Sequence, residues 1–146
     1  MDLEVNVYAK IARPVDAVFA AVTDPGQLSA YFTTGGASGP LAEGATVIWR
    51  FADYPGEIPV RVARLVTNER IEFSWDAEEG TYQTAVVMTF ERLADGGTRV
   101  RVVESGWRQG PEGLKGSYLN CSGWTQMLCF LKGYLEYRIN LRRGFF

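Results

Sequence analysis

The sequence predicts an α+β fold, in which a curved antiparallel sheet of six strands wraps around a long C-terminal helix, with two short helices after the first strand. Segments of alternating apolar and polar residues indicate the strands, short turn motifs join most of them, and the C-terminal segment has helical spacing. A chain of 146 residues can bury a sizeable core. We therefore expect a single domain over residues 1–146.

The N-terminal part is predicted to hold one strand and two short helices. Residues 4–11 alternate between polar and apolar, which is the period of a half-buried strand. Pro14 suits the first turn of a helix whose apolar residues recur at helical spacing over residues 15–22. Asp24 is expected to cap a second short helix, from which residues 28–32 carry apolar side chains inward.

Five further strands are predicted to follow as an antiparallel meander, because short turns join successive strands. Asn68-Glu69 and Asp95-Gly96-Gly97 are the clearest turn signals. The glycine-rich residues 105–116 are expected to form a mobile connection to the last helix. The expected strands are residues 46–51, 57–66, 70–75, 82–90 and 98–104.

The last helix, expected over about residues 118–143, is apolar over a wide arc. At about 100° per residue the apolar side chains span roughly 200°, whereas a surface helix buries roughly 100°. The helix must therefore be covered on two sides or line a cavity. Its basic residues Arg138, Arg142 and Arg143 are expected to complement the carbonyls at its C-terminus. The apolar arc comprises Trp124, Met127, Leu128, Phe130, Leu131, Tyr134, Leu135, Tyr137, Ile139 and Leu141.

Composition argues against several function classes. The net charge is −2 with mixed signs, so there is no basic stripe for nucleic acid. No apolar run approaches a membrane span of roughly 18 residues, and we expect a cytoplasmic protein. Cys121 and Cys129 would lie about 12 Å apart on the last helix, too far to bond. Since the chain has no histidine and no phosphate-binding glycine loop, neither a metal nor another cofactor is expected.

Several short motifs follow one another along the chain. They are Ala12-Arg13-Pro14-Val15-Asp16-Ala17-Val18-Phe19, Thr23-Asp24-Pro25, Glu69-Arg70-Ile71-Glu72-Phe73-Ser74-Trp75, Gly97-Thr98-Arg99-Val100, Glu104-Ser105-Gly106 and Gly123-Trp124. In this order and spacing they resemble the domain of the activator of heat-shock-protein-90 ATPase homologues, within the START and birch-pollen-allergen-like (SRPBCC) superfamily. The resemblance covers nearly the whole chain, implies the helix-grip fold, and departs at Tyr31-Phe32, where many relatives have a tryptophan.

The leading hypothesis is a small-molecule binding module. A hydrophobic or amphipathic ligand, lipid-like or aromatic, would lie in a cavity between the sheet and the last helix. The alternative is that the same side chains form an ordinary core. Gly123 is expected to let the last helix begin close to a neighbouring backbone. The candidate ligand-binding residues are Phe32, Trp49, Phe73, Trp75, Tyr82, Val86, Met88, Val102, Glu104, Trp124, Leu128 and Leu131.

Glu104 is the most informative polar candidate. It continues the face of Val100 and Val102 and is expected to point inward, where Arg50, Arg64 or a tyrosine hydroxyl would pair with it. The alternative is a strand-end glutamate that has already reached solvent. Trp107 could cover the mouth of the pocket or lie on the surface.

Two other function classes stay open. The resemblance implies a co-chaperone-like interaction domain that binds a chaperone, or a polyketide cyclase/aromatase-like enzyme with Glu104 and Tyr82 as acid or base. Catalysis has little support, because the chain lacks histidine and shows no nucleophile with a base. The aromatic tail Gly144-Phe145-Phe146 is expected to cover a neighbouring subunit in a homodimer.

Overall fold

The computed structural model describes residues 1–146 and has the predicted α+β architecture. Seven strands form one sheet in the order β1-β7-β6-β5-β4-β3-β2, and every neighbouring pair is antiparallel. The helices are α1 (Val15–Thr23), α2 (Pro25–Ser29) and α3 (Pro111–Tyr137). The strands are β1 (Glu4–Ile11), β2 (Gly36–Ala37), β3 (Thr46–Phe51), β4 (Tyr54–Val66), β5 (Arg70–Asp76), β6 (Gln83–Arg92) and β7 (Thr98–Ser105).

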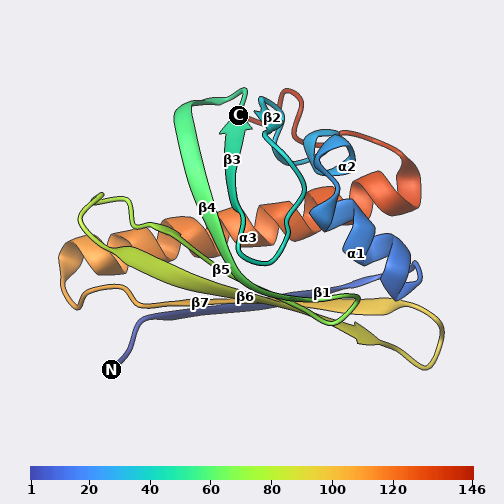
Figure 1. The fold of residues 1–146 in the computed structure, drawn as a ribbon, viewed down its shortest axis with the longest axis horizontal. Coiled ribbons are helices and arrows are strands. Elements are labelled where there is room, and N and C mark those ends of the chain that lie inside the picture. Colours follow the sequence, from blue (N-terminus) through green and yellow to red (C-terminus); the bar gives the residue numbers. More distant parts are fainter.

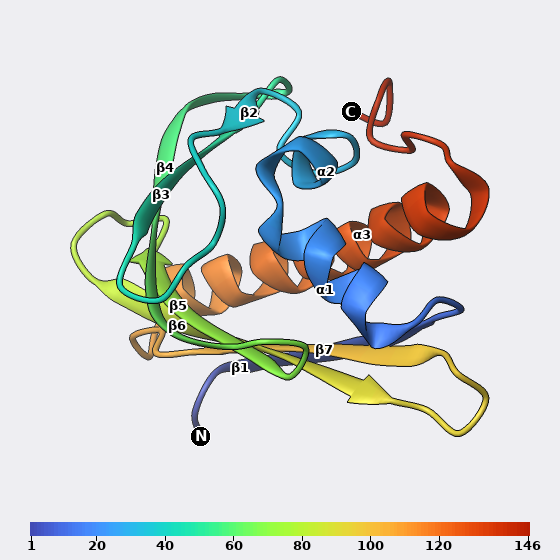
Figure 2. The same ribbon diagram turned by 45° about the vertical axis from the view of Figure 1, so that its right-hand side comes forward.

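The sheet bends around α3, as the helix-grip prediction requires. In Figure 1 and Figure 2, β3 and β4 rise out of the layer formed by β1, β6 and β7, and α3 crosses the concave side. Register shifts between Trp49 and Phe51 of β3, and between Val62 and Arg64 of β4, coincide with this bend, since bulges increase local bending. The prediction of six strands is wrong by one, because Gly36–Ala37 pairs with β3.

Short sequence signals set the turns as expected. The Asp24 side chain accepts a hydrogen bond from the backbone N–H of Gln27 at 2.9 Å and so caps α2. Asn68 adopts φ 64° in the turn between β4 and β5, and Gly96 adopts φ 87° between β6 and β7. Both conformations belong to tight turns, which favour asparagine and glycine.

The last helix differs from its prediction at both ends. It begins at Pro111, whose missing N–H suits a first helical position, so part of the expected mobile connection is helical. It ends at Tyr137, because Arg138 takes the left-handed conformation (φ 57°) that closes a helix. Ile139 and Leu141 therefore leave the apolar arc and are 46% and 41% exposed.

Glu136 attaches the end of α3 to the end of β1. It accepts a hydrogen bond from the backbone N–H of Ala12 at 3.0 Å and pairs with Lys132. Burial alone would raise the pKa of Glu136, but the hydrogen bonds from Lys132 and Ala12 and the charges of Lys132 and Arg13 lower this pKa overall. The carboxylate therefore stabilises the folded state in its charged form.

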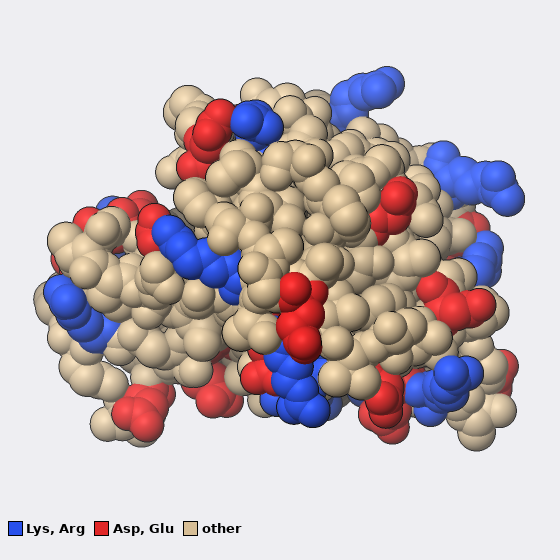
Figure 3. Space-filling model, in the orientation of Figure 1, with Lys and Arg blue, Asp and Glu red and all other residues tan.

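The core lies between the concave face of the sheet and α3, where 28 buried apolar side chains form one cluster. Along β7 the even-numbered residues from Thr98 to Glu104 are buried and alternate with partly exposed ones, so Glu104 takes a core position. Acidic and basic side chains are interspersed on the face shown in Figure 3. None of the helices has the length and apolar character that crossing a membrane requires.

Candidate functional site

Glu104 lies at the centre of the concave side and is fully buried, as the strand period predicted. Its carboxylate accepts hydrogen bonds from two indole N–H groups, Trp75 on Oε2 at 2.8 Å and Trp124 on Oε1 at 2.8 Å. The Thr84 hydroxyl donates to Oε2 at 2.6 Å, and the Asn120 amide reaches both oxygens at 3.1 and 3.0 Å. β5, β6, β7 and α3 are therefore joined through one side chain.

The predicted partners of Glu104 are wrong. Arg50 pairs with Glu57 at 2.7 Å and Arg64 pairs with Glu72 at 3.5 Å, and all four side chains are partly exposed. Neither arginine therefore pairs with the buried carboxylate of Glu104. The observed donors are neutral, so hydrogen bonding rather than an ion pair compensates for the burial of this carboxylate.

An aromatic cluster surrounds this carboxylate. Trp75 and Trp124 stack with their ring centroids 5.2 Å apart and their planes 24° apart. Phe73 contacts both indoles, at 5.5 and 6.2 Å between centroids. Phe32, from the segment after α2, packs on Trp124 at 6.2 Å and edge-on against Trp49 at 5.7 Å. These five residues, which we call the aromatic cluster, pack on one another between the sheet and α3.

Trp49 contributes the one buried side-chain nitrogen or oxygen atom that has no hydrogen-bond partner. Its indole is 1% exposed, and its Nε1–H does not reach Glu104. A buried donor left unpaired costs about 1–3 kcal/mol. Trp75 and Trp124 avoid this cost because both donate to Glu104.

The glycines of α3 identify an open face of the helix. Gly123 lies in the middle of α3, so the prediction that it begins the helix is wrong, and a Cβ added there would meet no atom within 4 Å. At 100° per residue it shares a face with Phe130 and Tyr134, which pack on Phe145 and Tyr31. The other three glycines have close neighbours: an added Cβ would lie 1.8 Å from Arg108 at Gly113, 3.2 Å from Trp107 at Gly116 and 2.7 Å from Leu141 at Gly133.

Most of the other predicted residues lie on the concave side, and one does not. Tyr82 precedes β6, donates its hydroxyl to Glu79 at 3.0 Å, and accepts from the backbone N–H of Arg108 at 3.2 Å. The pairing of Tyr82 with Glu104 that an acid–base role would need is therefore absent. Trp107 is buried, at 7% exposed. The side chains of Val86, Met88, Val102, Leu128 and Leu131 are buried in the core.

The sequence analysis missed Thr84 and Asn120 as parts of this site. Thr84 was recognisable, because it is two residues from Val86 on the inward face of a strand. No sequence pattern marked Asn120, because it lies in a turn of α3 that was expected to be the beginning of the helix. Only the docking of α3 on the sheet brings its amide to Glu104.

The C-terminal tail, residues 138–146, covers one side of the aromatic cluster. The Arg142 guanidinium forms a bidentate pair with Asp53 at 3.0–3.1 Å and lies 4.6 Å from the ring centre of Phe51 and 5.4 Å from that of Phe32. The expectation that Arg142 stands at the helix C-terminus is therefore wrong, because the chain turns back after Arg138. Figure 2 shows the tail rising beside α2.

Tyr31, which follows α2 in the chain, packs against α3. It stacks on Tyr134 of α3 with the ring centroids 5.2 Å apart, and its hydroxyl donates to the Ala21 carbonyl at 3.0 Å. Burial, followed by the nearby Tyr134, raises the pKa of Tyr31 well above its usual value. Tyr31 is thus a neutral structural residue.

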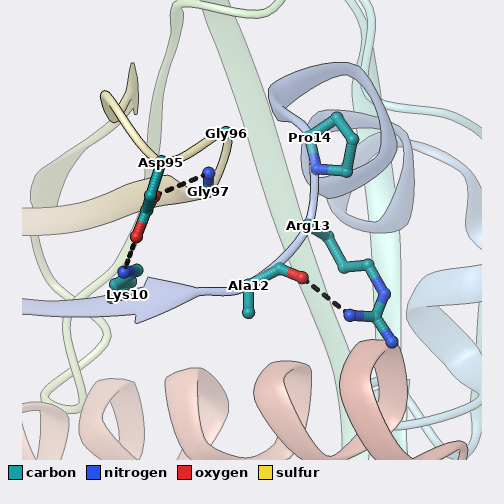
Figure 4. A pocket seen from close by; sticks show the side chains of 7 residues that line it. All are labelled: Lys10, Ala12, Arg13, Pro14, Asp95, Gly96 and Gly97. Carbon is teal, nitrogen blue, oxygen red and sulfur yellow. Dashed lines mark hydrogen bonds and ion pairs between the residues drawn. The ribbon is translucent and has the colours of Figure 1, made fainter.

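Two surface depressions lie outside the aromatic cluster. One of about 150 Å³ lies between the end of β1 and the β6–β7 turn, where Lys10 pairs with Asp95 and Arg13 donates to the Ala12 carbonyl (Figure 4). The other, of about 340 Å³, lies between β1 and α3 and is lined by Asn6, Val7, Tyr8, Ala9, Thr125, Leu128 and Cys129. Neither includes a residue of the aromatic cluster.

Comparison with protein families agrees with this architecture. The model of the family described as "Activator of Hsp90 ATPase homolog 1-like protein" matches residues 12–136. None of the curated proteins matches the sequence.

Several solved structures have the same fold. SSP2350 from Staphylococcus saprophyticus is 24% identical, with a TM-score of 0.80 over 95% of this chain and 96% of that chain. DynU16, from the dynemicin biosynthetic locus, is 28% identical with a TM-score of 0.81, and the match covers 94% of this chain and 49% of DynU16. The Aha1 dimer from Colwellia psychrerythraea is 22% identical, with a TM-score of 0.77 over 92% and 96% of the two chains.

Proposed function

The chain belongs to the Activator of Hsp90 ATPase homolog 1-like family, and on this basis we propose that it binds a small, largely apolar or aromatic molecule between the concave face of the sheet and α3. The observation that carries the proposal is the open helix face at Gly123, next in sequence to Trp124 of the aromatic cluster. A ligand there would approach the helix backbone closely, on the helix face that Gly123 shares with Phe130 and Tyr134.

The absence of a packing reason for Gly123 supports this assignment. Glycine in a helix interior is about 1 kcal/mol less favourable than alanine. Close packing explains the glycine at Gly113, Gly116 and Gly133, because neighbouring atoms there leave little or no room for a side chain. Gly123 has no such neighbour within the chain. Access for a ligand accounts for a glycine at this position.

The bonding of Glu104 favours binding over catalysis. Its two oxygens accept five hydrogen bonds from four side chains, which hold Trp75, Trp124 and Asn120 in place. Since the carboxylate is fully buried and engaged, it is poorly placed to exchange a proton with a substrate. We propose that Glu104 fixes the orientation of the Trp75 and Trp124 indoles before a ligand binds. The cyclase-like alternative loses its proposed pair of acid and base, because Tyr82 bonds elsewhere.

The test uses 1-anilinonaphthalene-8-sulfonate as a fluorescent probe. The wild-type protein should bind it saturably, and Gly123→Leu should weaken binding about tenfold or more by filling the open face. Ser122→Leu is the matched control, because it adds the same side chain at the neighbouring exposed position of α3. Equal affinities of Gly123→Leu and Ser122→Leu would refute the proposed location.

Native mass spectrometry of the purified protein distinguishes the proposal from the co-chaperone alternative. A co-purifying small molecule supports ligand binding. A ligand-free mass together with capture of a chaperone would favour the interaction domain, which rests on the family resemblance alone.

The homodimer stays a prediction. The dimer reported for the Colwellia psychrerythraea protein supports it, and so does the exposure of Phe145 and Phe146, at 54% and 66%. Within the chain Phe145 also packs edge-on against Phe130, so the tail has an intramolecular contact as well.

A further inference from the structure

The C-terminal tail, residues 138–146, presents apolar side chains to solvent. The rings of Phe145 and Phe146 contact each other with their centroids 5.1 Å apart, and both remain more than half exposed. Tyr54 is exposed beside the tail, because it follows Asp53, which pairs with Arg142. Single exposed apolar side chains are ordinary, whereas a group of them marks an interaction surface. The large exposed apolar residues of this group are Tyr54, Tyr137, Ile139, Leu141, Phe145 and Phe146.

The same segment carries positive charge that the chain does not neutralise. Arg138 and Arg143 are exposed and form no ion pair, whereas Arg142 pairs with Asp53. Residues 137–146 contain no acidic side chain, although the net charge of the whole chain is −2. We call the six exposed apolar residues, together with Arg138 and Arg143, the tail patch. It combines apolar side chains with two available cations.

The tail is held in one conformation, so these side chains are presented together. The side-chain oxygen of Asn140 accepts hydrogen bonds from the backbone N–H groups of Arg142 and Arg143, both at 3.1 Å. Leu141 lies against Gly133 of α3, where an added Cβ would be 2.7 Å from the leucine. Figure 2 shows the tail on the outside of the molecule, beyond the end of α3. Because the tail is already ordered, binding through it costs little further conformational entropy.

We propose that the tail patch binds the surface of an anionic lipid bilayer. Its aromatic and aliphatic side chains enter the boundary between lipid headgroups and acyl chains, where apolar and aromatic residues of peripheral proteins lie. Arg138 and Arg143 bind the lipid phosphates, since a guanidinium can donate two parallel hydrogen bonds to phosphate oxygens. This inference goes beyond the proposed function and does not depend on it.

A second copy of the chain fits the tail patch less well. Contact about a two-fold axis brings the same surface of both copies together, and here it would place four unpaired guanidinium groups in one interface. Like charges repel unless an acid lies between them. Asp53 is the acidic residue that pairs with the tail, and Arg142 already engages it. An anionic bilayer supplies the negative charge that a second copy lacks.

Sedimentation with sucrose-loaded vesicles tests the proposal. Vesicles of phosphatidylcholine alone are compared with vesicles in which about one lipid in four is phosphatidylserine. At about 0.1 M salt the wild type should sediment with the anionic vesicles and stay in solution with the neutral ones. Raising the salt to about 0.5 M should release most of the protein, because salt screens the attraction between arginine and phosphate.

A charge variant with a matched control tests the role of the arginines. The double variant Arg138→Gln and Arg143→Gln should weaken binding to the anionic vesicles about 25-fold, at about fivefold for each arginine. The control is Arg92→Gln with Lys115→Gln, which removes the same charge from two exposed positions outside the tail patch. This control should bind the vesicles as the wild type does.

A second variant tests the apolar part of the patch. Phe146→Ser should weaken vesicle binding about tenfold, because a ring that enters the bilayer boundary is lost. Tyr118→Ser is its control, since it removes an aromatic ring of equal exposure near the start of α3. Circular dichroism should show an unchanged fold in all of these variants, because every substituted side chain is exposed.

The results distinguish the bilayer from a second copy of the chain. Absence of vesicle binding by the wild type, or equal binding to neutral and anionic vesicles, would overturn the proposal, and so would variants that lose no more affinity than their controls. Light scattering after size-exclusion chromatography is the further measurement. A wild-type dimer that ignores the vesicles and that Phe146→Ser converts to a monomer would assign the tail patch to a second copy instead. Binding of 1-anilinonaphthalene-8-sulfonate tests the proposed function separately.

Discussion

Replacing Glu104 by glutamine tests the organisation of the site directly. Each carboxylate oxygen accepts from one indole, Oε1 from Trp124 and Oε2 from Trp75. A glutamine side chain has only one carbonyl oxygen, so its NH₂ group must face one of the two indole N–H groups in either orientation. The Thr84 hydroxyl can rotate and the Asn120 amide can flip, but an indole has no acceptor to offer.

The expected loss of stability follows from this count. An indole N–H that had bonded the carboxylate and an amide N–H of the glutamine are left unpaired, at about 1–3 kcal/mol each. The neutral amide has a smaller desolvation cost than the buried carboxylate and offsets part of this. We therefore expect Glu104→Gln to lower the free energy of unfolding by about 3 kcal/mol.

The assay is urea unfolding followed by tryptophan fluorescence and circular dichroism at neutral pH, with the m-value compared between proteins. Glu72→Gln is the control, because Glu72 is a half-buried strand glutamate paired with Arg70 at 3.0 Å on the other face of the sheet. It should lose far less stability. A loss below about 1 kcal/mol for Glu104→Gln, with an unchanged m-value, would refute the bonding scheme.

Three further predictions concern α3 and the tail. Trp124→Phe should lower the free energy of unfolding by about 1.5–3 kcal/mol through the lost bond to Glu104, and Trp124→Ala by about 3–5 kcal/mol through an added cavity; equal losses in denaturant titrations would contradict this separation. Because the folded pKa of Glu136 lies below its ordinary value of 4.5, its stabilisation is complete above about pH 4.5 and is lost as the pH falls through the folded pKa. The stability difference between wild type and Glu136→Gln should thus be larger at pH 7 than at pH 3, and an equal difference at both would refute the assignment. Asp53→Asn should weaken the bidentate pair with Arg142 and speed backbone hydrogen exchange in residues 138–146. The control is Arg143→Gln, at an exposed residue with no ion pair, which should leave this exchange unchanged. Unchanged exchange in Asp53→Asn would show that the pair does not hold the tail.

Local patterns were enough to predict most of the fold. Side-chain alternation depends only on the strand period, so the buried position of Glu104 followed from Val100 and Val102. The turns at Asn68 and Gly96 followed from backbone preferences of single residues. The helix ends were less predictable, because Arg138 adopts a left-handed conformation that its residue type does not favour.

The partners within the site could not be predicted in the same way. The sequence indicated an inward carboxylate but named Arg50, Arg64 or a tyrosine hydroxyl as its partner, since a cation or a hydroxyl donor is the simplest expectation for a buried carboxylate. The structure instead brings neutral donors to it from three other elements, and the orientation of Trp124 and Asn120 depends on how α3 docks on the sheet.

The sequence by itself determined the architecture, the inward face of each strand and the aromatic character of the concave side, because these depend on periodicity and turn chemistry along the chain. Only the tertiary structure decided that Glu104 binds two indoles, that Trp49 is left without an acceptor, and that Gly123 faces open space. Hydrogen bonds and steric gaps depend on the distances and directions between elements far apart in sequence, which no local pattern encodes.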